Sequence, residues 1–155
     1  MLKNITKKKV ALFILLLFTI IQFIRIDKTV KPVDANFDFI SITNPDVKLA
    51  SILKTACYDC HSNQSIYPWY TNIAPISWWI KHHINEGSRH LNFSVWASYS
   101  QKKQKHKLEE CISLIEEDKM PMYSYTLMHK EARLSAEQKE LLLNWFNKIK
   151  NTIPK

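Results

Sequence analysis

The stretch Cys57-Tyr58-Asp59-Cys60-His61 decides how the 155-residue chain is interpreted. C-x-x-C-H is the attachment signature of c-type haem. Its spacing suits that chemistry, because two thiols three residues apart can reach the two vinyl groups of the porphyrin and become thioethers. The adjacent His61 is then placed beneath the iron as its proximal ligand. We therefore predict one covalent haem c, held by Cys57 and Cys60, with its iron bound by His61.

Three other uses of this cysteine pair fit the sequence less well. A structural zinc site would want a second pair of ligands at regular spacing, and Cys111 is the one cysteine left. A thioredoxin-type redox pair would follow a strand, whereas the segment before Cys57 has a helical pattern. The third alternative is a structural disulfide between Cys57 and Cys60. Cys111 lies on the apolar side of a predicted helix, so we expect a buried core thiol there.

The iron would have a sixth position, for which Met120-Pro121 supplies the favoured candidate. The pair follows one predicted helix and precedes the last one, 59 residues after His61. In small cytochromes c, a methionine in such a Met-Pro loop supplies the thioether opposite the histidine, which raises the reduction potential relative to two histidines. The alternatives that we retain are Met122, Met128, His129, His82 and His83, or a vacant position.

An apolar run near the N-terminus predicts export of the rest of the chain. Residues 10–24 carry no charge and follow three lysines. As a helix they cover about 22 Å, short of a hydrocarbon core of roughly 30 Å, but Ile26 extends the run and Lys9 and Arg25 can snorkel. We predict a cytoplasmic basic tail over 1–9, a signal-anchor helix over 10–26 and a linker over 27–43. A cleaved signal peptide is the main alternative, and a buried core helix is the third.

The net charge of +8 resembles that of a nucleic-acid-binding protein until it is mapped along the chain. Residues 1–31 hold seven basic residues and one acid, which leaves 15 basic residues and 13 acids for all the rest. A cationic nucleic-acid module keeps its charge on the folded domain, so we expect no nucleic-acid partner. One basic stretch remains at 102–107, which we interpret as a solvated helix start or a docking patch for an acidic redox partner or anionic lipid.

The single glycine, Gly87, excludes several classes of protein. Phosphate-binding loops, dinucleotide fingerprints and G-x-S-x-G elbows all need more glycines, and many-stranded sandwiches use glycine-rich turns. An all-α fold is favoured, and we expect Gly87 to be the C-cap of a helix.

Apolar residues at helical spacing predict the helices of a domain over 44–155. Asn44-Pro45 is expected to open a helix that runs into the cysteine motif, and Pro75 to open one that ends near Gly87. Ser94 is expected to cap a short helix, and a longer one should run from about 105 until just before Met120. A capping box at Ser135 and Gln138 should open the last helix. The stretches 61–74 and 119–134 are predicted to be loops.

These residues together resemble the bacterial haem-binding domain family, a branch of monohaem c-type cytochromes. The likeness runs from about residue 50 to 145 through ordered motifs: Cys57-x-x-Cys60-His61-Ser62-Asn63, Tyr67-Pro68-Trp69-Tyr70, Ile73-Ala74-Pro75-x-Ser77-Trp78, His83-x-x-Glu86-Gly87, Leu91-Asn92-Phe93-Ser94-x-Trp96 and Met120-Pro121-x-x-x-Tyr125-x-x-x-His129. The resemblance implies covalent haem at Cys57, Cys60 and His61 inside a cytochrome c-like helical domain. It also implies that Met120-Pro121 occupies the distal-loop position.

The expected function is electron carriage by a membrane-tethered monohaem cytochrome on the periplasmic side of the bacterial cytoplasmic membrane. The protein is then not an enzyme, and its partners are redox proteins of an electron-transport chain, the cytochrome c maturation machinery and, through the N-terminal helix, the membrane. Arg89 is a candidate contact for a haem propionate. The alternative is a haem-based sensor or a peroxidase-like protein with an open or displaceable sixth ligand position. A haem-binding accessory domain of an assembly is a third hypothesis.

Overall fold

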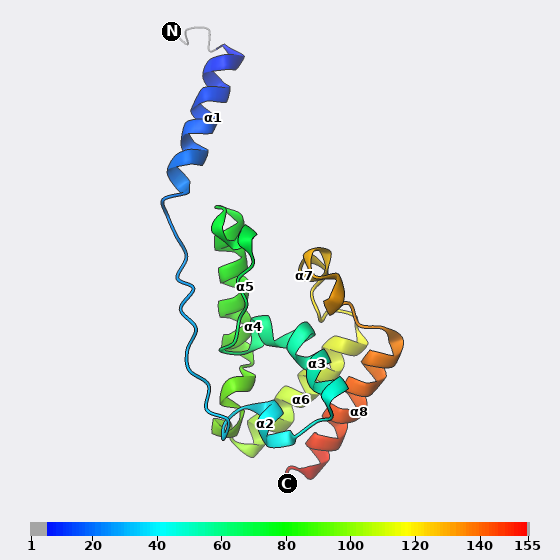
Figure 1. Ribbon diagram of the computed structural model, residues 1–155. Coiled ribbons are helices and arrows are strands. Elements are labelled where there is room, and N and C mark those ends of the chain that lie inside the picture. The colour runs from blue at the N-terminus through cyan, green and yellow to red at the C-terminus, as the bar shows by residue number, and fades with distance from the viewer. Residues whose placement is uncertain (1–5, 155) are drawn as a thin grey trace. The chain divides into compact units, whose positions relative to one another are not determined.

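The computed structural model describes residues 6–154, and every regular element among them is helical (Figure 1). The prediction of an all-α fold is confirmed. The α-helices are α1 (Lys7–Ile21), α2 (Phe39–Thr43), α3 (Val47–Leu53), α4 (Asp59–His61), α5 (Ile76–His90), α6 (Gln101–Glu116), α7 (Tyr123–Met128) and α8 (Ala136–Thr152). A π-helical segment, η1 (Lys54–Tyr58), joins α3 to α4, and short 3₁₀ segments are η2 (Trp69–Asn72), η3 (Phe93–Ser98) and η4 (Lys130–Ala132).

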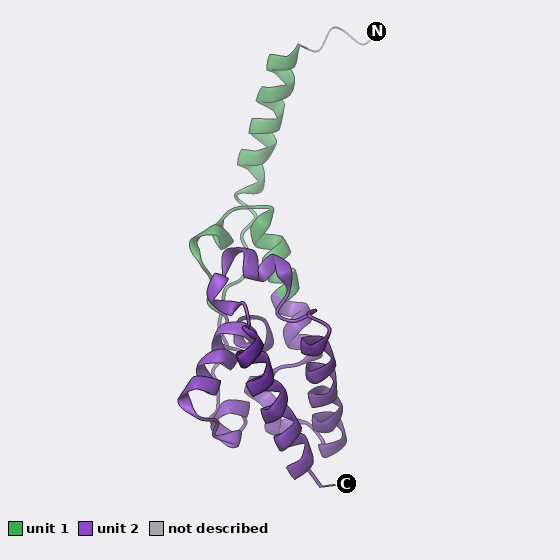
Figure 2. Cartoon of the chain, turned by 90° about the vertical axis from the view of Figure 1, so that its right-hand side faces the viewer, with its two compact units in different colours: residues 1–29, 66–83 green, residues 30–65, 84–155 purple. Residues whose placement is uncertain are grey.

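The chain divides into two compact units, which Figure 2 colours separately. Unit 1 combines residues 1–29 with 66–83, and unit 2 combines 30–65 with 84–155. Helix α5 contributes its first half to unit 1 and its second half to unit 2. Unit 2 contains the C-x-x-C-H motif, the segment after Met120 and the hydrophobic core.

The core of unit 2 is built around three buried phenylalanines. The ring of Phe39 lies 5.0 Å from that of Phe93 and 6.1 Å from that of Phe146. Tyr58, inside the cysteine motif, stacks on Phe93 at 5.4 Å and 7°. Its hydroxyl donates to the carboxylate of Asp38 at 3.2 Å, so a buried acid is satisfied beside the motif. Burial of each such aromatic side chain stabilises the fold by about 1.5–3 kcal/mol. The contacts of Tyr58 with Phe93 and Asp38 therefore hold the cysteine motif against the core.

Side-chain caps define where the helices begin, and two of the predicted caps are wrong. Asp46 caps α3, since its carboxylate accepts from the N–H of Leu49 at 2.8 Å. Asn44 instead ends α2 with a φ of 45°, a left-handed conformation that asparagine tolerates. Asn92, not Ser94, caps η3. The capping box predicted at Ser135 and Gln138 is present.

Short helices account for the other differences from the predicted map. Segment 119–134 contains α7 and η4, and segment 61–74 contains η2. Helix α2 lies inside the predicted linker, where its Phe39 is fully buried. Helix α6 begins at Gln101 because Ser100 caps it, which is earlier than the periodicity indicates. Elements of three to six residues are too short to show a repeat of apolar residues, so helical periodicity does not predict them.

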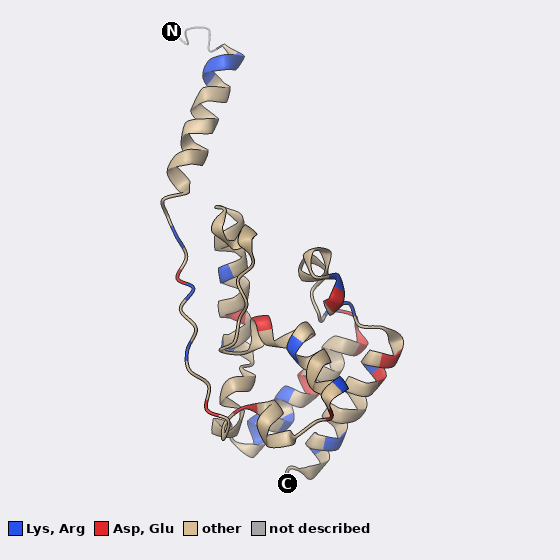
Figure 3. Ribbon diagram, viewed as in Figure 1, with Lys and Arg blue, Asp and Glu red and all other residues tan. Residues whose placement is uncertain are grey.

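The N-terminal helix α1 forms over Lys7–Ile21, and none of its residues is buried. Figure 3 shows that, beyond the lysines of its first turn, the helix carries no charged side chain. Among residues 6–154, no helix combines the length and the hydropathy that crossing a membrane requires.

Candidate cofactor site

The two cysteines and the histidine of the motif lie on one continuous helical path. Cys57 belongs to η1, whereas Cys60 and His61 belong to α4. The widened π-helical turn falls on the first cysteine, and such turns are frequent at functional sites. The path ends at Ser62, which is buried and donates from its hydroxyl to the carbonyl of Tyr58 at 2.7 Å. The motif is therefore held at its C-terminal end by Ser62 as well as in its middle by Tyr58.

Both thiols of the motif are free, and burial keeps them neutral. Burial raises the pKa of Cys57 to about 12 and that of Cys60 to about 11. A thiolate-bound zinc ion needs deprotonated cysteines and further ligands. Within residues 6–154, no group of three or more histidine, cysteine or acidic side chains is arranged to hold a metal ion. The donor set at the motif therefore consists of two thiols and one imidazole, which is the set that attachment of haem c requires.

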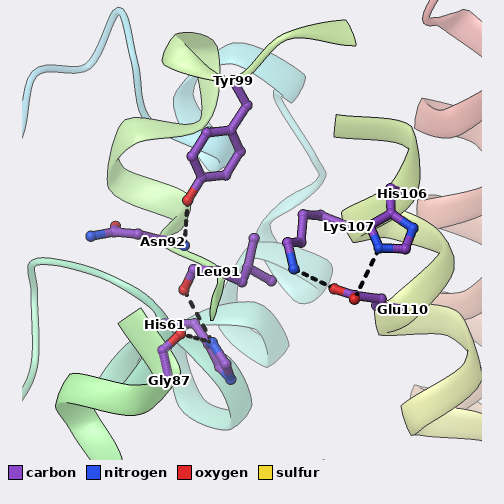
Figure 4. A network of polar contacts seen from close by, with 8 residues as sticks. All are labelled: His61, Gly87, Leu91, Asn92, Tyr99, His106, Lys107 and Glu110. Carbon is purple, nitrogen blue, oxygen red and sulfur yellow. Dashed lines mark hydrogen bonds and ion pairs between the residues drawn. The ribbon is translucent and has the colours of Figure 1, made fainter. Parts of the chain in front are cut away.

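The imidazole of His61 is oriented by two backbone carbonyls (Figure 4). Its Nδ1 lies 3.0 Å from the carbonyl oxygen of Gly87 and 3.1 Å from that of Leu91. Carbonyl oxygens only accept, so Nδ1 carries the proton and Nε2 keeps its lone pair for a ligand. Burial lowers the pKa of His61, which also favours the neutral ring. An axial histidine needs this tautomer and this kind of partner.

Gly87 lies inside helix α5, so its predicted position as a helix C-cap is wrong. A Cβ atom added there would lie 2.7 Å from the carbonyl oxygen of Cys60 and 3.1 Å from the Cβ of Cys60. Only glycine lets α5 approach the motif this closely, and the approach brings the Gly87 carbonyl within reach of His61. The single glycine of the chain thus serves close packing at the site.

The segment from Met120 to η4 is tied to the motif through Tyr125. The hydroxyl of Tyr125 donates to the carboxylate of Asp59 at 2.8 Å, and it also lies 3.2 Å from the carbonyl oxygen of Thr55. Asp59 stands between the two cysteines, so this bond joins the predicted distal segment to the middle of the C-x-x-C sequence. Met120 is half-buried, and its N–H donates to the carbonyl of Leu114 at 3.1 Å.

Sequence reasoning missed the contribution of Tyr125. The residue appears in the family-like pattern Met120-Pro121-x-x-x-Tyr125, but nothing in that spacing names Asp59 as its partner. The signal that was present is a tyrosine at a fixed distance after the Met-Pro pair. The two carbonyls that orient His61 had no signal of their own, since any residue carries a backbone oxygen.

The other candidate iron ligands have different surroundings. His129 stacks on Tyr125 at 4.4 Å, and its Nδ1 lies 3.1 Å from the carboxylate of Glu131. The Nδ1 of His83 lies 2.8 Å from the carbonyl of Trp79 within unit 1, and His82 is exposed in the same unit. Met122 precedes α7 as its cap, and Met128 ends that helix and is 60% exposed.

Arg89 and, within the basic stretch of α6, Lys107 each have an acidic partner. Arg89 is exposed and forms an ion pair with Glu86 at 2.5 Å, which raises the pKa of its guanidinium. Lys107 points inward with only 13% of its side chain exposed, and it pairs with Glu110 at 2.6 Å. His106 approaches the same carboxylate at 3.2 Å (Figure 4).

Cys111 packs beside the core cluster rather than at the surface. Burial raises the pKa of its thiol, which keeps it protonated. The sequence predicts a buried core thiol, and Cys111 is partly buried against the core.

The helical fold and the paired thiols with an oriented imidazole define a haem-binding protein. The model of the family described as "Haem-binding domain" matches residues 16–148, so the chain belongs to this family. The match includes the C-x-x-C-H motif, Gly87, Tyr125 and the Met120-Pro121 pair. No curated protein and no solved structure matches the chain.

Proposed function

We propose that the chain is a membrane-tethered monohaem c-type cytochrome that carries single electrons outside the cytoplasmic membrane. The observation that supports this most is the imidazole of His61, fixed in one tautomer by Gly87 and Leu91 directly after a pair of neutral thiols. Membership of the haem-binding domain family supplies the cofactor. Covalent attachment, electron transfer and the tether are what the proposal adds.

The residues that would hold haem are Cys57 and Cys60, through thioether bonds, and His61, through Nε2. Haem supplies a one-electron iron couple when bound. The chain's part is to orient the imidazole of His61 and to keep it neutral. Tyr58 and the phenylalanine core exclude water from the buried part of the motif. Carbonyl partners at the other ring nitrogen fix the ring orientation of a metal-binding histidine and raise its basicity.

We propose that Met120 would supply the second protein ligand to the iron. The Tyr125–Asp59 hydrogen bond supports this, because it fixes the segment that follows Met120 to the cysteine motif. Met122, His129 and His83 are the alternatives. Arg89 would contact a propionate only after leaving Glu86.

A sensor or peroxidase-like protein is the second candidate function. It is favoured by the His129–Glu131 pair, because a histidine beside a carboxylate is a suitable acid–base group. This function requires an open or displaceable sixth position on the iron.

The proposed location is the periplasmic side of the bacterial cytoplasmic membrane, where the maturation machinery would attach haem. The exposed and uncharged residues 10–20 of α1 support a membrane tether, and a cleaved leader with a soluble periplasmic product is the alternative. Redox proteins of an electron-transport chain are the proposed partners, and no nucleic acid is expected.

Optical redox titration of the purified full-length protein tests the carrier function. We expect a low-spin haem, an absorption band near 695 nm in the oxidised form from thioether ligation, and one reversible one-electron transition. A high-spin oxidised haem that lacks this band and turns over hydrogen peroxide would instead establish the second candidate.

A further inference from the structure

Within unit 1, the C-terminal end of α1 is bonded to a segment that follows some 50 residues later. The side-chain amide of Gln22 donates to the carbonyl of Ala74 at 3.0 Å and accepts from its N–H at 2.9 Å. The indole N–H of Trp78 donates to the carbonyl of Ile24 at 3.0 Å. Ala74 is buried, so Gln22 satisfies both backbone polar groups of a residue that has little access to water.

Two basic side chains extend this attachment beyond the helix. Arg25 donates to the backbone carbonyl of Asn72 at 2.9 Å, and Lys28 donates to the side-chain oxygen of Asn72 at 2.6 Å. Residues 22–28 are therefore joined to residues 72–78 by five hydrogen bonds. A flexible leader would lack these hydrogen bonds, and the same polar groups would be hydrated instead.

The segment bonded to α1 exposes large apolar side chains. Trp69 is 72% exposed and Ile66 is 71% exposed, while Ile76 and Trp79 are each 48% exposed. Tryptophan is buried to a large extent in most soluble proteins, so two exposed ones on one short segment are informative. Tryptophan is enriched where proteins meet the interface between lipid and water.

The charge around these side chains is positive. Lys28 and Lys81 lie 5.8 Å and 5.6 Å from the ring centre of Tyr67, and Lys81 also donates to its hydroxyl at 3.1 Å. Asp27 is the one acid among residues 22–29 and 66–83. Basic residues beside exposed aromatic rings suit the anionic headgroups of a phospholipid bilayer.

Helix α1 alone is too short to cross a hydrocarbon core. Its 15 residues span about 22 Å, which is less than the roughly 30 Å of a hydrocarbon core. A second element with exposed tryptophans at the end of the helix would occupy the interfacial layer that the helix itself does not reach. The family match begins at residue 16, inside α1, so it includes both the end of the helix and the segment bonded to it.

We infer that residues 66–81, bonded to residues 22–28, form a platform that rests in the headgroup layer of an anionic phospholipid bilayer. This inference rests on the membrane tether of the proposed function and adds a second contact with lipid to it. It also makes residues 22–28 part of the mature protein rather than of a removed leader.

Site-specific photocrosslinking in the full-length haem-loaded protein tests the platform. p-Benzoylphenylalanine would replace Trp69 or Trp79 in the platform, Leu15 within α1, and the exposed Val47 and Tyr123 of unit 2 as matched controls. The protein would be irradiated in nanodiscs that contain phosphatidylglycerol, and lipid adducts would be measured by mass spectrometry. We expect adducts at positions 15, 69 and 79, at least fivefold above those at 47 and 123.

Each other outcome contradicts the inference in a distinct way. Adducts at position 15 without adducts at 69 and 79 would overturn the platform and leave the tether intact. An absence of adducts at all three positions would reject the tether and the platform together. Equal adducts at the control positions would show contact with lipid over the whole protein and would also overturn the platform.

A variant of the attachment provides a second test. Gln22→Leu removes both hydrogen bonds to Ala74, and we expect adducts at position 69 to fall severalfold while those at position 15 persist. Thr19→Val, which removes a hydroxyl that donates to the carbonyl of Leu15 within α1, is the control. Unchanged adducts at position 69 in Gln22→Leu would contradict the attachment, and circular dichroism and haem content would establish that each variant is folded.

Discussion

The two sides of the candidate haem site in unit 2 are held very differently. On the proximal side, His61 is fixed by two carbonyls, backed by the aromatic core and approached by α5 through the one glycine. On the predicted distal side, Met120 is half-buried, and the segment after it is joined to the motif by the hydroxyl of Tyr125. The helix that carries this tyrosine also exposes Tyr123, Leu127 and Met128. The side chain of His61 is thus held directly, whereas Met120 is held through its backbone N–H and through Tyr125, five residues later.

Gly87→Ala is expected to give the largest effect, because it breaks the proximal side. The added Cβ would meet the Cys60 carbonyl oxygen at 2.7 Å, and a displaced α5 would carry the Gly87 carbonyl away from His61. We expect the free energy of unfolding to fall by about 1–3 kcal/mol and the yield of covalent haem to drop severalfold. Thermal unfolding and absorbance per protein measure the two quantities.

The control for this variant is Asn85→Ala on the same helix, where the side chain is exposed. Wild-type haem content in Gly87→Ala would show that α5 can shift away from Cys60 without loss of haem. The close approach of α5 to the motif would then not be required for haem attachment.

Met120→Leu is expected to change the distal side alone. Loss of the thioether should abolish the band near 695 nm and lower the reduction potential, while covalent haem remains. Met128→Leu, at an exposed position of α7, is the matched control and should change neither quantity. Persistence of the band in Met120→Leu would transfer the assignment to another methionine, of which Met122 is the nearest in sequence.

Tyr125→Phe tests how the segment after Met120 is held to the motif. We expect its effect to be intermediate among these predictions. The variant removes a 2.8 Å hydrogen bond to Asp59 and leaves the ring that stacks on His129. We expect the free energy of unfolding to fall by about 1–2 kcal/mol, and the band near 695 nm to weaken as the distal segment loosens. Tyr123→Phe on the same helix is the control, since Tyr123 is 75% exposed. An unaltered band with reduced stability would limit Tyr125 to a structural role.

Glu110 offers the smallest effect and a test by pH. The hydrogen bond from Lys107 holds the pKa of Glu110 below its ordinary value of 4.5. A carboxyl with a lowered pKa in the folded state stabilises the fold above its ordinary pKa, and this contribution disappears as the pH falls through the lowered value. Because 43% of the side chain is exposed, we expect Glu110→Gln to cost less than about 1 kcal/mol at pH 7 and nothing at a pH below the lowered pKa. Equal losses at both pH values in urea unfolding would contradict this account.

Most of the fold could be predicted from the sequence because long amphipathic helices and strong caps are local properties. The capping box at Ser135 and the helix through the cysteine motif are examples. Helices α2 and α7 were missed because five or six residues carry too little periodicity, and tertiary burial of Phe39 decides the first of them. The role of Gly87 was misjudged for a related reason. A glycine near a helix end suggests a cap, whereas its purpose here depends on the approach of Cys60, which is distant in sequence.

The candidate site could be predicted where the chemistry is written in consecutive residues. Cys57, Cys60 and His61 are adjacent in the sequence, so their joint role follows from spacing alone. The carbonyls of Gly87 and Leu91 and the bond from Tyr125 to Asp59 depend on contacts over 26 to 66 residues. No local pattern specifies such partners, which is why the supports of the site needed the structure.

The central claim is that haem is bound covalently at Cys57 and Cys60, and mass spectrometry of one peptide tests it directly. Trypsin should release residues 55–81 from protein matured in cells that attach haem c. The account predicts that this peptide carries the added mass of one haem after acid–acetone extraction and that Cys57→Ala with Cys60→Ala abolishes the addition. An unmodified peptide, with all the haem found in the acetone, would contradict it.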